Sequence, residues 1–307
     1  MKIKAMVDVF NTVKNWHIYA LDYIKVLKQP YIIHLKNGIR IWMRPNSLDR
    51  IVINDIWIYK TYTKEFDIGK DDIVVDVGAN IGIFSIFAAM FTKNKIYSFE
   101  PVPESFGLMK SNIILNKVSN IIPINKAMSG KTGKREFFVS KDKPAGSSFY
   151  PKDQPDWMFE KQEKMVVDGI SLKDFVKEYD IPQIDFLKID CEGCEYEMLF
   201  NCPINILKRI KRMSIEYHPH PYYKPVEGIE KRDKLRGFLE KNGFKTKTVD
   251  TYIYAQKTWN NMNPFDKWKT CKYATDSIHC SKLDHDVGVN GASIQFHCTN
   301  CLHYKHD

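Results

Sequence analysis

Apolar and polar residues alternate on both sides of an Asn-Gly pair in residues 31–43, YIIHLKNGIRIWM. Alternation is typical of strands, and Asn37-Gly38 is a preferred two-residue hairpin turn, so a β-hairpin is predicted here. Upstream, apolar residues between Met6 and Leu27 recur at nearly helical spacing, which predicts a helix packed on the domain, with a membrane-surface helix as the alternative. Residues 48–66 carry a mixed pattern, which predicts a helix or a helix and a strand.

From residue 73 onwards, short apolar runs alternate with helical patterns. Strands are expected at 73–77, 95–100, 120–124, 184–190 and 212–218, with shorter ones at 134–139 and 164–167 and an antiparallel pair at 244–249 and 251–257. Helices are expected at 83–91, 103–116, 172–179 and 228–242. This order predicts an α/β fold with a doubly wound, mostly parallel sheet and an antiparallel pair at one edge.

Composition and charge change this picture little. The chain has 307 residues, 44% of them hydrophobic, which suffices for one large domain with appendages. A net charge of +9 would suit nucleic acid, an anionic glycan or a membrane surface, but the basic residues are scattered. No apolar run of about 18 residues predicts a transmembrane helix, and the first residues lack the features of a secretory signal. We therefore expect a cytoplasmic protein.

Acidic residues stand where the predicted parallel strands end. Ligands of such sheets bind at the carboxyl ends of the strands, and four of the five strand ends carry carboxylates. Those that end or directly follow a strand are Asp76, Glu100, Asp190 and Glu216. A sheet that serves only as a core needs no acids at these positions, so a polar ligand is expected there.

The segment DVGANIG after the first of these strands predicts a tight turn against a small ligand. Gly78 and Gly82 allow close approach to the backbone, but Asn80 occupies the middle position of a dinucleotide-binding glycine pattern, and no phosphate-loop pattern is present. Asp76 suits a ligand with a cationic end, and Glu100 can accept both ribose hydroxyls. A ribose with a positive charge describes S-adenosylmethionine. Capping by Asp76 and a surface position of Glu100 is the alternative.

Several motifs in this order resemble the FkbM family of S-adenosylmethionine-dependent methyltransferases. They are DVGANIGIFS, SFEPVPESF, NKAMSG and LKIDCEGCEYEML, and the resemblance covers about residues 48–257. It implies a class I methyltransferase (Rossmann-like) fold with a seven-stranded sheet. It also implies a cofactor loop at Gly78, Ala79, Asn80 and Gly82, a ribose acid at Glu100 beside Pro101, and an adenine pocket at Ala127 and Met128.

The second half of the chain must supply the chemistry at the acceptor. Lys188 and Asp190 lie on one face of a strand, with Asp190 toward the cofactor, and Glu192 and Glu195 follow. His218 is the predicted general base, since an ordinary imidazole titrates near neutrality. Glu216 is expected to orient His218 or to touch the substrate. His220, Tyr222 and Tyr223 follow and are expected to form one wall of the acceptor site. Two alternatives remain open: a divalent metal held by Asp190, Glu216 and His218, and capping or salt-bridge roles for Glu192 and Glu195.

The cysteines fall into two groups. Cys191 and Cys194 form a C-x-x-C that could be a redox motif, but we expect two small buried thiols, and a third at Cys202. The C-terminal tail is rich in cysteine and histidine. Its candidate zinc ligands are Cys271, Cys280, Cys298 and Cys301, with disulfides or free thiols as alternatives.

The predicted organisation is an N-terminal helix and hairpin extension (1–66), a methyltransferase domain (67–257) and a Cys/His-rich extension (258–307). The predicted reaction is O-methylation of a hydroxyl on a sugar, a glycan or a small metabolite. RNA or protein acceptors are alternatives, as is a non-catalytic module that binds the cofactor or a partner. The acceptor and the oligomeric state are not encoded in these patterns.

Overall fold

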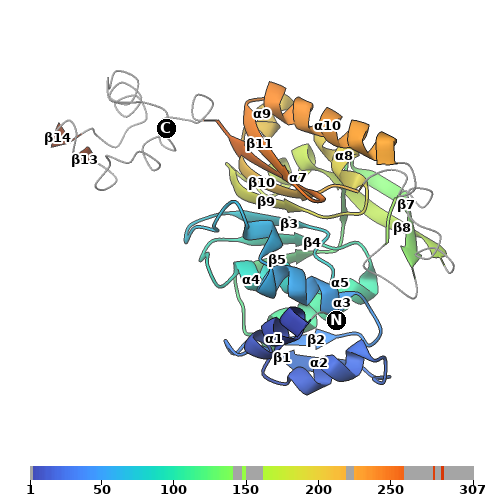
Figure 1. Cartoon of the computed structure of the whole chain (residues 1–307). Helices are drawn as coiled ribbons and strands as arrows, with labels where there is room; N and C mark the ends of the chain where they lie inside the picture. Colours follow the sequence, from blue (N-terminus) through green and yellow to red (C-terminus); the bar gives the residue numbers. More distant parts are fainter. Residues whose placement is uncertain are drawn as a thin grey trace. The chain divides into compact units, whose positions relative to one another are not determined.

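A computed structural model of the chain describes residues 3–140, 147–149, 162–218, 225–258, 279–280 and 285–286. Contacts divide the chain into two compact units, residues 1–256 and 257–307. In the second unit, the structure describes a pair of two-residue antiparallel strands, β13 (His279–Cys280) and β14 (His285–Asp286). The first unit holds the central sheet and its helices (Figure 1).

A seven-stranded sheet forms the centre of this unit, with strand order β11-β12-β10-β9-β3-β4-β5. The strands are β3 (Val74–Val77), β4 (Ile96–Phe99), β5 (Ile121–Ile124), β9 (Ile184–Ile189), β10 (Ile210–Glu216), β11 (Phe244–Val249) and β12 (Tyr252–Lys257). Neighbours from β10 to β5 run parallel, and β12 runs antiparallel to β10. The predicted mostly parallel sheet with an antiparallel edge is therefore confirmed.

The chain reverses its direction of travel across the sheet between β3 and β9. It moves from β3 outward to β4 and β5, and then returns to pair β9 with the other side of β3. All residues of β3 and β9 are buried, as expected for central strands covered on both faces. The crevice outside the carboxyl ends of β3 and β9 is thus the expected ligand site.

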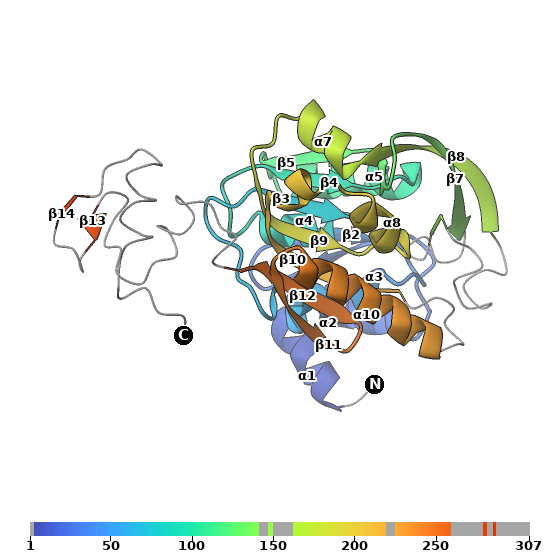
Figure 2. The same ribbon diagram turned by 90° about the horizontal axis from the view of Figure 1, so that it is seen from above.

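Helices cover both faces of the sheet (Figures 1 and 2). Two hydrophobic core clusters lie between the sheet and the helices. The first includes residues of α7 (Leu172–Glu178), α8 (Cys194–Phe200), α9 (Ile204–Leu207) and α10 (Pro225–Lys241). The other includes residues of α4 (Ile83–Ala88) and α5 (Pro103–Leu115), together with the N-terminal segment. Pro103 begins α5, and the Ser171 side chain caps α7 by accepting from the Asp174 amide.

The N-terminal segment contains α1 (Ile3–Thr12), α2 (Trp16–Tyr23), β1 (Tyr31–His34) and β2 (Arg40–Met43). The two strands form the predicted hairpin, which turns at Gly38 with a φ of +93°. It is anchored on α5, where Asn112 Oδ1 accepts from the Trp42 amide at 2.7 Å. The mixed segment 48–66 is helical in three short pieces, α3 (Asp49–Ile53), η1 (Asn54–Ile58) and η2 (Thr61–Thr63).

A smaller sheet of three strands in the order β6-β8-β7 lies beside the central one. Its strands are β6 (Ala127–Ser129), β7 (Gly133–Ser140) and β8 (Gln162–Ser171). β7 and β8 are longer than predicted because they pair along their whole length, from Gly133 with Gly169 to Ser140 with Gln162.

None of the helices in the described part of the chain has both the length and the apolar character that a membrane span requires.

Candidate active site

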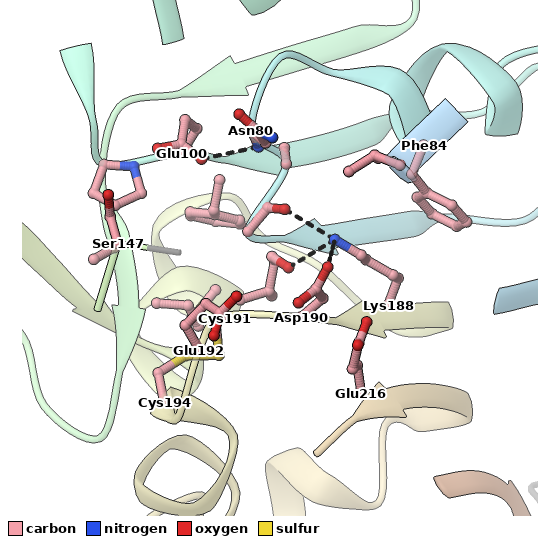
Figure 3. A pocket seen from close by; sticks show the side chains of 18 of the residues that line it. Asn80, Phe84, Glu100, Ser147, Lys188, Asp190, Cys191, Glu192, Cys194 and Glu216 are labelled. Carbon is pink, nitrogen blue, oxygen red and sulfur yellow. Dashed lines mark hydrogen bonds and ion pairs between the residues drawn. A yellow bond between two sulfur atoms is a disulfide. The ribbon is translucent and has the colours of Figure 1, made fainter. Parts of the chain in front are cut away.

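A cavity opens at the carboxyl ends of β3, β4 and β9, where the strand order changes direction (Figure 3). Most of the predicted site residues line it. They are Gly78, Ala79 and Asn80 after β3, Glu100 and Pro101 after β4, Ala127 and Met128 of β6, Lys188 of β9, Asp190 directly after β9, and Glu216 of β10. The structure thus brings together side chains that are up to 138 residues apart in the chain, as the strand-end rule predicts.

The turn after β3 needs glycine at position 78. Gly78 has a φ of +74°, and a Cβ there would lie 1.8 Å from the Asp190 carbonyl oxygen. The amides of Gly78 and Ala79 both donate to the Phe99 carbonyl, at 3.1 and 2.8 Å. Gly82 serves a different purpose, because it caps α4 at a φ of +84° and packs against Met109 outside the cavity lining.

Glu100 fastens the same turn from β4. Its Oε2 accepts from the Asn80 amide at 2.9 Å, and its Oε1 accepts from the Val102 amide at 2.8 Å. Burial raises the pKa of Glu100 to about 7, although the two amides and Arg44 act in the opposite direction. Glu100 lines the cavity, and a carboxylate with two oxygens can accept more than two hydrogen bonds.

Arg44, which the sequence analysis missed, holds Asn80 from the N-terminal segment. Its Nη2 donates to Asn80 Oδ1 at 2.7 Å and pairs with Asp49 Oδ1 at 2.5 Å, and its Nη1 donates to Ser105 Oγ at 2.9 Å. Both Arg44 and Asp49 are buried. The side chain of Asn80 is thereby fixed while its backbone holds a φ of +49°.

Asp76 and Lys188 form a buried layer below the turn. Lys188 Nζ lies 3.1 Å from Asp76 Oδ1 and donates to the Gly78 carbonyl at 2.9 Å. Burial lowers the pKa of Lys188, but the charges of Asp76 and Asp190 outweigh it and raise that pKa above its ordinary value. Asp76 is fully buried and does not line the cavity, and its other oxygen accepts from Ser85 Oγ at 2.6 Å. Asp76 therefore supports the ligand turn through Lys188.

Asp190 and Glu216 meet across the hydroxyl of Tyr62, a second residue that the sequence analysis missed. Tyr62 Oη lies 2.7 Å from Asp190 Oδ2 and 2.8 Å from Glu216 Oε2, and Tyr252 Oη donates to Glu216 Oε2 at 2.9 Å. Burial and the charge of Asp190 raise the pKa of Glu216 to about 7. The side chain of Asp190 is 28% exposed, so it is open to the cavity.

His218 lies behind Asp190 and does not line the cavity. Its Nε2 is 3.4 Å from Glu192 Oε2 and 3.8 Å from Asp190 Oδ1, and its Nδ1 is 3.4 Å from Glu195 Oε1. Burial lowers the pKa of His218, but Glu192 and Glu195 outweigh it and hold the pKa well above its usual range. An imidazolium already holds its proton, so this environment opposes the predicted role of His218 as a general base.

The nearest approach to a divalent metal site in the described part of the chain is Asp190, Glu192 and His218. One ligand atom from each lies within 4.8 Å of the others. Glu216, which the sequence analysis placed in such a site, is not part of the group. A divalent metal at the end of β9 therefore stays a prediction.

Cys191 and Cys194 form a disulfide, so the prediction of two buried thiols was wrong. Glu192 at a φ of +54° and Gly193 at +107° turn the chain sharply, which brings the two Cα atoms to 5.4 Å. Both cysteines line the cavity beside Asp190 (Figure 3). Cys202 is a buried free thiol, as predicted.

Some predicted residues lie outside the described part of the chain. They are His220, Tyr222 and Tyr223 of the acceptor wall, and Cys271, Cys298 and Cys301 of the tail. Cys280 lies in β13, but its side chain is not described. The acceptor wall and the tail zinc site stay predictions.

The strand order, the glycine turn after β3 and the acid after β4 define a class I S-adenosylmethionine-dependent methyltransferase. Residues 76–246 match the family described as "Methyltransferase FkbM domain". Because the match covers more than half of the chain, the protein belongs to the FkbM methyltransferase family, which confirms the resemblance seen in the sequence.

Three relatives named as methyltransferases each align with more than half of this chain. The chain is 26% identical over 200 residues to methyltransferase sdnD of Sordaria araneosa, covering 57% of this chain and 74% of sdnD. It is 25% identical over 191 residues to the hexuronic acid methyltransferase AglP of Haloferax volcanii (60% and 74%). It is 24% identical over 211 residues to the 31-O-demethyl-FK506 methyltransferase FkbM of Streptomyces tacrolimicus (61% and 81%).

Proposed function

We propose that this protein transfers the methyl group of S-adenosylmethionine to a hydroxyl of a sugar, a glycan or a small metabolite. The observation that carries the proposal is Asp190, a partly exposed carboxylate across the glycine turn from Glu100, in one cavity. The names of two relatives support the acceptor class, since one acts on a hexuronic acid and another on an O-demethylated natural product.

In this proposal, the cofactor lies along the turn after β3. Glu100 accepts hydrogen bonds from the ribose hydroxyls, as acids at this strand end do in related folds. Pro101, Ala127 and Met128 form the adenine side of the cavity, and Asp190 faces the sulfonium end. Asp76 and Lys188 act from below by holding the Gly78 carbonyl, so neither needs to touch the ligand.

Methyl transfer to oxygen needs alignment and removal of one proton. The sulfonium is a good leaving group, so holding the acceptor oxygen in line with the methyl group supplies much of the acceleration. Asp190 is the best-placed base, because it is open to the cavity while His218 lies behind it and is cationic. His218 then stabilises the carboxylates of the β9 end rather than accepting the proton.

The alternatives receive less support from the cavity. Its ionisable lining includes Asp55, Glu100, Asp190, Glu192 and Glu216 but one cation, Lys188, among the described residues. An acidic wall repels phosphate groups, which disfavours RNA despite the net charge of +9. A neutral polyol or a small metabolite fits this wall better.

The test is transfer of labelled methyl groups from S-adenosylmethionine to a cell extract from the source organism, followed by chemical analysis of the labelled fraction. The expected product is a methyl ether that survives mild base, and Asp190→Asn is expected to lower its formation at least about 100-fold. Asp168→Asn is the matched control, because Asp168 is exposed on β8 and pairs with Lys134 away from the cavity. Label found only in RNA or protein, or full transfer by Asp190→Asn, would reject the proposal.

A further inference from the structure

Proton counting around Tyr62 shows that its two carboxyl neighbours cannot both be ionised. The phenol oxygen is 2.7 Å from Asp190 Oδ2 and 2.8 Å from Glu216 Oε2, both ordinary O–H···O distances. A phenol has a single proton and can donate it to one of them. The remaining contact would bring two bare, negatively polarised oxygens together, so a second proton must lie on one of the carboxyls.

The surroundings decide which carboxyl holds that second proton. Asp190 faces two cations, with Lys188 Nζ 3.6 Å from its Oδ2 and His218 Nε2 3.8 Å from its Oδ1. No cation lies within ion-pair distance of Glu216 among the described residues, and its pKa is raised to about 7, first by burial and then by Asp190. The two cations beside Asp190 therefore favour Asp190 as the ionised carboxyl and Glu216 as the protonated one.

The phenol itself is held rigidly and stays protonated. Tyr62 is buried, its ring packs edge-on against Phe84 and Tyr252, and Ser214 Oγ donates to its carbonyl at 2.6 Å. Burial and the two acids raise the pKa of Tyr62 well above its ordinary value. Because a hydroxyl both donates and accepts, Tyr62 can serve as a fixed connector that donates to one acid and accepts from the other.

We propose that Tyr62 is a positioning residue that links Asp190 and Glu216 through one additional proton, held on Glu216, and so keeps Asp190 ionised for catalysis. This inference rests on the proposed hydroxyl transfer. In that reaction the acceptor oxygen forms a bond to the methyl carbon while the S–CH3 bond breaks, and its electron pair stays on sulfur. The hydroxyl proton passes to Asp190, which releases it to solvent through the cavity. Neither oxidant nor reductant is needed.

Other ionisable groups surround this linkage and enter any titration of it. On the N-terminal side there is Asp55 of η1, whose pKa is raised to about 6 by burial and Asp190. Lys188 lies in β9 and Glu192 lies in the segment that follows it. His218 lies in the segment after β10. Tyr252 of β12 donates to the same Glu216 oxygen as Tyr62 does. Tyr252 provides a comparison within the site, because it contacts Glu216 but makes no hydrogen bond to Asp190.

The experiment follows the protonation of Glu216 by carboxyl 13C NMR in the full chain saturated with S-adenosylhomocysteine, with the signal assigned by Glu216→Gln. In the wild type, Glu216 is expected to stay protonated up to about pH 7. Tyr62→Phe removes the acceptor of the Glu216 proton, so the midpoint should fall by about one pH unit. Tyr252→Phe removes a donor to Glu216, so the midpoint should rise instead.

Tyr254→Phe controls for loosening of η2, because the Tyr254 hydroxyl donates to the Thr61 carbonyl next to Tyr62 and to no acid. It should leave the Glu216 midpoint unchanged. A rise in Tyr62→Phe would mean that Tyr62 merely donates to an ionised Glu216, and would overturn the inference, as would an unchanged midpoint. The probe contains no acceptor, so a failure here is separate from a failure to find a methylated hydroxyl.

Discussion

At the scale of single residues, the site depends on positions where only one residue type fits. Gly78 is the clearest, because the backbone of the β9 end passes where its side chain would be. Asn80 and Glu192 adopt positive φ without being glycine, and both sit at the cavity. Such conformations cost free energy and persist where surrounding contacts enforce them, as Arg44 does for Asn80.

Gly78→Ala is expected to abolish cofactor binding and to destabilise the fold by about 2–4 kcal/mol, because a Cβ cannot occupy space 1.8 Å from the Asp190 carbonyl oxygen. Gly107→Ala is the matched control, since Gly107 lies within α5 with nothing within 4 Å of its Cβ position. The free energy of unfolding of the Gly107→Ala variant should rise by about 0.5–1 kcal/mol. Titration calorimetry with S-adenosylhomocysteine and urea unfolding measure both, and normal binding by Gly78→Ala would contradict the prediction.

At the scale of elements, sequence patterns located the hairpin, the parallel strands and the acids at their ends. Those features depend on local alternation and on one general rule of sheet topology, so they could be predicted. Arg44 and Tyr62 could not, because each lies in an irregular helical or turn segment with no chemical motif around it. Their roles arise from how the segment before residue 67 packs against the sheet, which is long-range information.

Arg44→Lys is expected to weaken cofactor binding about 10-fold and to lower the free energy of unfolding by about 1–2 kcal/mol. Lysine keeps the charge beside Asp49 but cannot reach Asp49, Asn80 and Ser105 together as the planar guanidinium does. Arg40→Lys on the same hairpin is the control, since Arg40 bonds to the exposed Leu115 carbonyl. Equal affinities of the two variants in calorimetry would remove Arg44 from the site.

The disulfide at the start of α8 is expected to stabilise the chain by about 2 kcal/mol, because it closes a loop of only a few residues in the unfolded state. A thiol reductant should lower the free energy of unfolding of the wild type by that amount. The double variant Cys191→Ser/Cys194→Ser keeps the tail cysteines and should show no such decrease. An equal response of the two proteins would assign the effect to cysteines elsewhere.

At the scale of the whole molecule, a basic chain encloses an acidic cavity. The net charge is +9, yet Asp55, Glu100 and Glu216 are carboxyls at the cavity whose pKa values are raised to between about 6 and about 7. Folded carboxyls with raised pKa values bind protons more tightly than unfolded ones. Their contribution to stability is therefore present at low pH and is lost as the pH rises through the folded pKa.

Asp55→Asn tests this balance, because asparagine resembles the protonated acid. Burial and then Asp190 raise the pKa of Asp55 to about 6, so wild type and variant should be equally stable near pH 4. Above pH 7 the variant should be more stable by about 1–2 kcal/mol, after allowance for solvent screening. Urea unfolding across this range measures the difference, and a difference that does not change with pH would refute the prediction.

The bond between Arg44 and Asn80 has a consequence for how such enzymes can be recombined. The family match begins at residue 76, yet Asp55 and Tyr62 line the cavity from before that boundary, and Arg44 holds the cavity residue Asn80. A catalytic unit cut at residue 67 would leave Asn80 without its guanidinium and the acids of β9 and β10 without their phenol. The leading segment and the sheet are therefore not interchangeable modules, and a chimaera between relatives would have to take both from the same parent.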